Sequence, residues 1–163
     1  METLRVGLAP RALALDSKSN VWAVSMIRPD GTQASAGGCS GNGTISLPWG
    51  INVDGNDDVW TTNDWTHGIV YMAGDNTAGH PAGTKAGDVL HLFTSGAFET
   101  FTDVSIDAAG NAWCANNWND LPIAMARTQD PARSTWGGGT GINVIYGVAE
   151  PVQPPRMGKV RRP

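Results

Sequence analysis

Hydrophobic and polar residues alternate in three short segments of the chain, and each alternation ends in the same way. The segments read LALDSKSNVWAV at 13–24, INVDGNDDVWTT at 51–62 and VSIDAAGNAWCA at 104–115. In each one, two apolar residues at alternate positions lead to an Asp, a polar turn follows, and a Trp comes six residues after the Asp. Alternation with period two is typical of a β-strand with one buried face, and Ser, Gly, Asn and Asp are typical of turns. The pattern therefore predicts β-hairpins near residues 12–25, 50–63 and 103–116.

The three hairpins share a register, which makes them an internal repeat. The paired residues are Asp16 and Trp22, Asp54 and Trp60, and Asp107 and Trp113. The tryptophans recur at intervals of roughly 40 to 50 residues, which is the length of one β-propeller blade with a variable loop. We predict an all-β fold, a partial β-propeller of about three four-stranded antiparallel blades, with the tryptophan rings filling the space between adjacent blades.

Further strands are expected after the hairpins. GIVYM at 68–72, VLHLF at 89–93 and INVIYGVA at 142–149 are rich in β-branched and aromatic residues. Residues 73–88 contain almost no apolar side chains and are read as a long surface loop. The predicted organisation is a repeat region over 1–149 and an extended, Pro-rich basic tail over 150–163.

Three repeats are too few for a closed ring. Propellers close with roughly four to eight blades. Three alternatives remain open: the chain is the C-terminal part of a longer propeller, two copies form a homodimer that completes a six-bladed ring, or a first blade is only partly present. The first two predict an exposed apolar flank on the isolated chain.

Composition narrows the classes of partner. The chain has 163 residues, 16% of them charged, and a net charge of -4, so one domain is expected and nucleic acid is not an expected partner. It contains no apolar run of the roughly 18 residues that a membrane span needs, and its first residues do not resemble a signal peptide. Cys39 and Cys114 allow at most one disulfide, match no zinc pattern, and leave pairing and compartment open.

The repeat resembles a known group of proteins. LPWGINVDGNDDVWTTN at 47–63 and FTDVSIDAAGNAWCANNW at 101–118 resemble NHL-type and streptogramin-lyase-like β-propeller repeats. GVAEPVQPPRMGKVRRP at 147–163 resembles the C-terminal end of bacterial proteins with such repeats, most of them exported. The resemblance implies a bacterial propeller protein in an extracytoplasmic compartment, with its export signal upstream of this chain. Because one fold serves many functions, function must be argued from the sites.

Streptogramin lyases use a histidine base and a bound Mg²⁺ to open a cyclic ester, so the resemblance directs attention to histidines and acidic turns. His67 is the weak candidate for a base, whereas His80 and His91 are interpreted as solvated residues of a loop and a strand face. The weak candidates for a metal site are Asp54, Asn56, Asp57 and Asp58. These four residues are also typical turn formers, and that interpretation is preferred, so no metal or other cofactor is expected outside a lyase.

Two polar and aromatic clusters follow the second strand of a hairpin and are the best candidates for a ligand site. They are Asn63, Asp64 and Trp65, and Asn116, Asn117 and Trp118. Asn and Trp suit a flat polar ligand such as a sugar. The alternative is that the Asn side chains cap loop amides and the Trp rings pack between blades.

These observations give three hypotheses of function. The preferred one is a non-catalytic binding or scaffold module that recognises a ligand or a protein partner through its rim loops. The second is a metal-dependent carbon–oxygen lyase with His67 as base. The third is a fragment without activity of its own.

Overall fold

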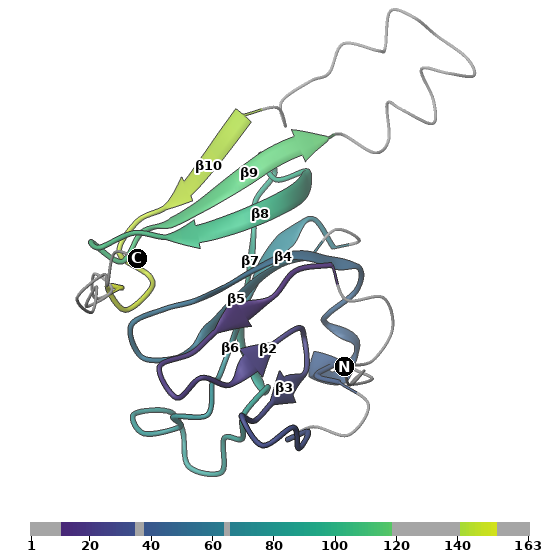
Figure 1. Cartoon of the computed structure of the whole chain (residues 1–163). Helices are drawn as coiled ribbons and strands as arrows, with labels where there is room; N and C mark the ends of the chain where they lie inside the picture. Colours follow the sequence, from purple (N-terminus) through teal and green to yellow (C-terminus); the bar gives the residue numbers. More distant parts are fainter. Residues whose placement is uncertain (1–10, 35–37, 64–65, 119–140, 153–163) are drawn as a thin grey trace, which may run out of the picture.

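The computed structural model describes residues 11–34, 38–63, 66–118 and 141–152, with the side chains of 117 and 118 left aside (Figure 1). Within these ranges it contains ten β-strands, a single 3₁₀ turn at Gly41–Gly43 and no α-helix. The predicted all-β class is confirmed. No described segment forms a helix with the length and hydrophobicity needed to cross a membrane.

The strands form three antiparallel sheets that follow one another along the chain. The first sheet contains β1 (Ala14–Leu15), β2 (Val21–Trp22) and β3 (Met26–Ile27). The second contains β4 (Pro48–Val53), β5 (Val59–Asn63), β6 (Gly68–Met72) and β7 (Val89–Thr94). The third contains β8 (Thr100–Ile106), β9 (Ala112–Trp118) and β10 (Gly141–Ile145).

The predicted hairpins correspond to β1–β2, β4–β5 and β8–β9. The strands expected at 68–72 and 89–93 are also present, and the expected strand at 142–149 ends earlier, at Ile145. Four strands are seen in the second sheet alone; the first and third have three each within the described residues. The last part of the expected closing strand turns away at Tyr146 and Gly147, where Gly147 has a positive φ.

The first strands of successive sheets lie side by side, β1 next to β4 and β4 next to β8. Figure 1 shows the three sheets stacked in chain order, with β2 and β3 at one end and β8 to β10 at the other. Neighbouring blades of a propeller have this arrangement, with the first strand of each blade nearest a common axis. Within the described residues the three sheets do not close into a ring, so the fold is that of a partial propeller.

Two apolar clusters lie between the sheets. Trp22 of the first sheet packs with Ile51 and Val70 of the second. Trp60 of the second sheet packs with Phe101 and other residues of the third, and its ring stacks on Tyr71 with centroids 4.6 Å apart. Both tryptophans are fully buried, as the repeat predicts.

Trp113 departs from this prediction. Its side chain is 40% exposed, because no described sheet lies against the outer side of the third sheet. The expectation that all three tryptophans are buried between blades is therefore wrong for the last one. The predicted exposed apolar flank is present at this position.

The two cysteines belong to different clusters. Cys39 packs in the first cluster and Cys114 in the second, and no disulfide joins them. Burial raises the pKa of the Cys114 thiol to about 12, so it is a protonated, apolar core group rather than a nucleophile.

Candidate functional site

A hydrogen bond joins the Asp and the Trp of each repeat and explains the six-residue interval between them. In each repeat the indole Nε1–H donates to Oδ2 of the Asp, at 3.0 Å in the first, 2.9 Å in the second and 2.8 Å in the third. Oδ1 of the same Asp accepts the backbone N–H groups two and four residues later. One carboxylate therefore fixes the turn and orients the ring that packs between the sheets.

The second repeat differs from the others at the fourth residue after the Asp. Asn20 and Asn111 occupy this position in the first and third repeats and donate their side-chain amides to the Asp. The second repeat has Asp58, whose side chain is fully buried. A carboxylate accepts hydrogen bonds and does not donate them, so Asp58 needs other partners.

Asp58 finds its partners in its own turn, on β6 and in the loop that follows. Asn56 of the turn donates its side-chain amide at 3.0 Å. Tyr71 donates its hydroxyl at 2.7 Å and Gly74 its backbone N–H at 2.9 Å. His80 Nε2 lies 2.9 Å from Asp58 Oδ1, and its side chain is only 11% exposed. The interpretation of His80 as a solvated loop residue is therefore wrong. The loop folds back onto the hairpin because this buried carboxylate binds it.

Charge and burial shift the pKa values of the groups around Asp58. Burial is the largest cause that raises the pKa of Asp54, against the hydrogen bond from Trp60. Burial, then the hydrogen bond to Asp58, raises the pKa of Tyr71 well above its usual 10.0. Tyr71 therefore stays protonated and acts as a hydrogen-bond donor at neutral pH.

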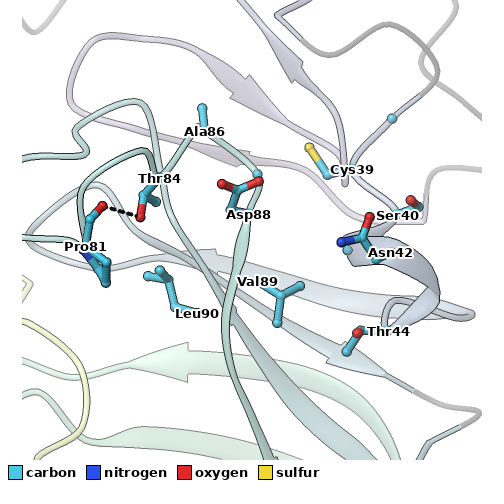
Figure 2. A pocket seen from close by; sticks show the side chains of 13 residues that line it. Cys39, Ser40, Asn42, Thr44, Pro81, Thr84, Ala86, Asp88, Val89 and Leu90 are labelled. Atoms are coloured by element: carbon cyan, nitrogen blue, oxygen red, sulfur yellow. Dashed lines mark hydrogen bonds between the residues drawn. The ribbon is translucent and has the colours of Figure 1, made fainter.

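A cavity of about 720 Å³ lies between the loop before β4 and the loop before β7 (Figure 2). Figure 2 shows Cys39, Ser40, Asn42 and Thr44 along one wall and the side chains from Pro81 to Leu90 along the other. The polar lining groups are hydroxyls, one amide and one carboxylate: Ser40, Asn42, Thr44, Thr84 and Asp88. Ala86, Val89 and Leu90 supply apolar surface.

Hydrogen bonds hold both walls. The Cys39 N–H donates to the Val24 carbonyl and the Gly87 N–H to the Ala73 carbonyl, both at 2.8 Å. The Lys85 N–H donates to Asp88 Oδ2 at 2.8 Å. The walls meet where a side chain at Gly87 would collide with Cys39 Sγ. The cavity is thus formed by fixed backbone.

The predicted ligand residues lie in several places. Asn63 is fully buried; its Oδ1 accepts the Ser46 N–H at 2.7 Å and its Nδ2 donates to the Thr44 carbonyl, so it holds the wall of the cavity from behind. Asn116 is bonded in the same way to the loop before β8, through the Glu99 N–H and the Ala97 carbonyl. Direct contact of either amide with a ligand stays a prediction.

The side chains of the other four predicted ligand residues lie outside the described part of the structure. Asp64 and Trp65 lie outside the described residues. Asn117 and Trp118 end β9, but their side chains are likewise outside the described part.

His67 and His91 do not line the cavity, and they lie in different environments. His67 has a φ of 48°, and its Nδ1 is buried with no hydrogen-bond partner among the described residues. His91 is exposed on β7, with its ring edge against Phe93. None of the three histidines lines the cavity.

The candidate metal ligands share one turn but bind different partners. Asp54 holds the turn, Asp58 binds His80 and Tyr71, and Asp57 accepts the N–H and hydroxyl of Ser17 at 2.7 and 2.5 Å. Their oxygens already accept N–H and O–H donors, which does not fit a Mg²⁺ ligand set. No cluster of three or more His, Cys, Asp or Glu side chains within the described ranges is arranged to hold a metal ion.

No protein-family model matches the chain, and no curated protein matches it either. Among solved structures, the chain is similar to selenomethionine-substituted virginiamycin B lyase from Staphylococcus aureus, with 19% identity and a TM-score of 0.42. The match covers 66% of this chain and 36% of the lyase chain, so the chain spans about a third of that protein. At this identity the likeness concerns the fold alone.

Proposed function

We propose that this propeller-type module binds a small ligand, without catalysis, in the cavity between residues 38–44 and 81–90. The observation that carries the proposal is that both walls are fixed by backbone hydrogen bonds. A pre-formed site costs little ordering entropy on binding, and most small-molecule sites are largely pre-formed concavities.

The lining favours a neutral polyhydroxylated ligand, that is, a sugar. Ser40 and Asn42 offer hydroxyl and amide groups that both donate and accept hydrogen bonds. The Thr84 hydroxyl donates to the Pro81 carbonyl, so it offers an acceptor, as Asp88 does. Val89 and Leu90 offer apolar surface for the C–H face of a sugar ring. The described lining residues include no Lys, Arg or His, which gives no support for an anionic ligand.

Binding is favoured over elimination because a base must lie within hydrogen-bond reach of the proton it removes. None of the described lining residues is a histidine, and His80, the nearest in sequence to them, has its Nε2 engaged by Asp58.

The test is calorimetric titration of the purified chain with a panel of mono- and disaccharides. For a sugar that binds, Ser40→Ala and Asn42→Gly should each weaken binding about tenfold, the effect of one lost hydrogen bond. Gly is chosen at position 42 because Asn42 has a φ of 54°, which Gly adopts without strain. Ser105→Ala, an exposed serine of β8, is the matched control and should bind as the unchanged chain does. A chain that binds none of the sugars, or variants that bind equally well, would contradict the proposal.

The lyase hypothesis retains one supporting observation, the buried Nδ1 of His67 without a described partner. If this histidine is a base, the chain opens a cyclic ester in the presence of Mg²⁺ and His67→Ala abolishes that activity. If His67→Ala and the unchanged chain bind sugar equally well and neither opens the ester, the lyase hypothesis is excluded and the binding module is supported.

A further inference from the structure

Exposed apolar side chains gather at the two ends of the stack of sheets. Leu13 and Leu15, at the first strand, are 67% and 66% exposed. On the third sheet Ile142 is 71% exposed and Trp113 is 40% exposed. Exposed apolar faces of this kind mark interaction surfaces.

The exposed face of the third sheet corresponds to a buried face of the second. Strand pairing places Tyr71 opposite Trp60 and Ile69 opposite Thr62, and it places Val144 opposite Trp113 and Ile142 opposite Ala115. The face made by Trp60, Ile69 and Tyr71 is covered by the third sheet, and Trp60 and Ile69 are 0% exposed. We call the equivalent face of the third sheet, made by Trp113, Ile142 and Val144, the open tryptophan face.

The exposed leucines hold the repeat positions whose side chains, in the second and third sheets, cover the tryptophan of the preceding sheet. Ile51, three residues before the repeat Asp, packs in the cluster around Trp22, and Val104 at the same position packs in the cluster around Trp60. Leu13 holds this position in the first repeat. Leu15 likewise corresponds to Val53 and Ile106, which pack against the same two clusters. We call Leu13 and Leu15 the leucine edge.

The contact between a tryptophan face and the first strand of the next sheet occurs twice within the chain. The open tryptophan face and the leucine edge are the two surfaces of a third such contact. We propose that the occupant of each of these two surfaces is a second copy of this chain, with the leucine edge of each copy packed on the open tryptophan face of the other. Two such contacts related by a two-fold axis join two sets of three sheets into a closed ring of six, within the range of propeller rings. The second copy is the chosen occupant because its complementary surface is present on the chain itself.

The experiment measures mass in solution by light scattering after size exclusion, over a wide range of concentration. The unchanged chain, of 17.1 kDa, should elute at twice that mass. Leu15→Glu and Ile142→Glu should each shift the population to the monomer, because each change places a charge at both junctions of the ring. Both positions are exposed, so circular dichroism should show folded variants. Leu47→Glu, an exposed leucine of the loop before β4, is the matched control and should leave the pair intact.

Mixing the two variants tests which faces meet. A pair with one Leu15→Glu chain and one Ile142→Glu chain has one junction with both changes and one junction with none. The mixture should therefore form a pair, although neither variant pairs with itself. A chain that stays monomeric at every concentration, as expected if sheets of a longer polypeptide cover these faces, would overturn the proposal. Pairs that survive both changes, or masses that grow without limit as in an open filament, would also overturn it.

Discussion

The repeat Asp has two structural roles at the level of single residues, and they explain why the Asp–Trp interval is so regular. Its Oδ1 binds the turn, and its Oδ2 binds the indole six residues later, as in Asp16 and Trp22. The interval was visible in the sequence, but its cause was not. A buried indole N–H needs an acceptor, and the sequence alone does not identify the group that accepts. Asp54 is buried and Asp107 is partly exposed, and their responses to pH should differ.

Asp107 and Asp54 should contribute to stability with opposite pH dependence. Hydrogen bonds from the Asn111 N–H and the Trp113 indole lower the pKa of Asp107, whereas burial raises the pKa of Asp54. A lowered pKa contributes stability above the ordinary value of 3.8 that is lost as pH falls; a raised pKa contributes stability below 3.8 that is lost as pH rises through the folded value.

Urea unfolding at a series of pH values between about 3 and 6 measures this difference. Asp107→Asn should flatten the loss of stability on acidification, and Asp54→Asn should steepen it. The same slope in both variants would contradict the assignment.

The contact between Asp58 and His80 should act as the anchor of the 73–88 loop. His80→Ala removes one partner of a fully buried carboxylate, a loss of about 1–3 kcal/mol in the free energy of unfolding. Lys85 is an exposed residue of this loop, so trypsin cleavage after Lys85 reports on its opening. Cleavage should become several-fold faster in His80→Ala. His91→Ala, an exposed histidine on β7, should leave the rate unchanged, and equal rates in all three proteins would show that the contact does not anchor the loop.

At the level of strands and loops, the sequence predicted the hairpins well and the loops poorly. Period-two alternation marks a strand with one buried face, as in Ile51 and Val53 before the turn at Asp54. The loop 73–88 lacks apolar periodicity, and its fold depends on a partner in another segment, Asp58 in the turn before β5. Asp58 in place of the Asn seen in the other two repeats was the signal that could have identified this contact. The cavity walls were equally unpredictable, because they depend on backbone contacts such as that from Gly87 to Ala73.

The close approach of β4 and β8 is a property of these strands that a single substitution can test. A Cβ at Gly50 would lie 2.5 Å from the Asp103 Cα, so Gly50→Ala forces the two inner strands apart. Overpacking of this kind costs about 1–3 kcal/mol in the free energy of unfolding. Gly96→Ala is the matched control, because a Cβ there meets no atom within 4 Å. Urea unfolding should show the loss in Gly50→Ala alone, and equal midpoints would mean that the strands are not so close.

On the scale of the whole molecule, the sheets are joined by apolar packing and by the short segment after β10. The sequence assigned residues 150–163 to an extended basic tail. Residues 146–152, the described part of the segment after β10, bind the turns of two repeats. The Ala149 N–H donates to the Gly110 carbonyl, and the Gly55 N–H donates to the Glu150 carbonyl, both at 3.0 Å. Composition could not predict this, because backbone groups form these bonds and any residue type supplies them.

This segment should therefore contribute to the coupling of the second and third sheets. A chain that ends at Tyr146 loses the two bonds above and those of the Gly147 and Glu150 N–H groups, which donate to Asn111 Oδ1 and Asp54 Oδ2. At about 1 kcal/mol per hydrogen bond, less the entropy regained by the freed segment, the expected loss is about 2–4 kcal/mol. A chain that ends at Val152 is the reference, because it keeps all four bonds. Amide hydrogen exchange should show faster opening of β8 and β9 than of β5 and β6 in the shorter chain, because the third sheet has lost its tie to the second while the second still packs on the first. Uniformly faster exchange in all three sheets would instead mean that the molecule unfolds as one unit, with apolar packing alone coupling its sheets.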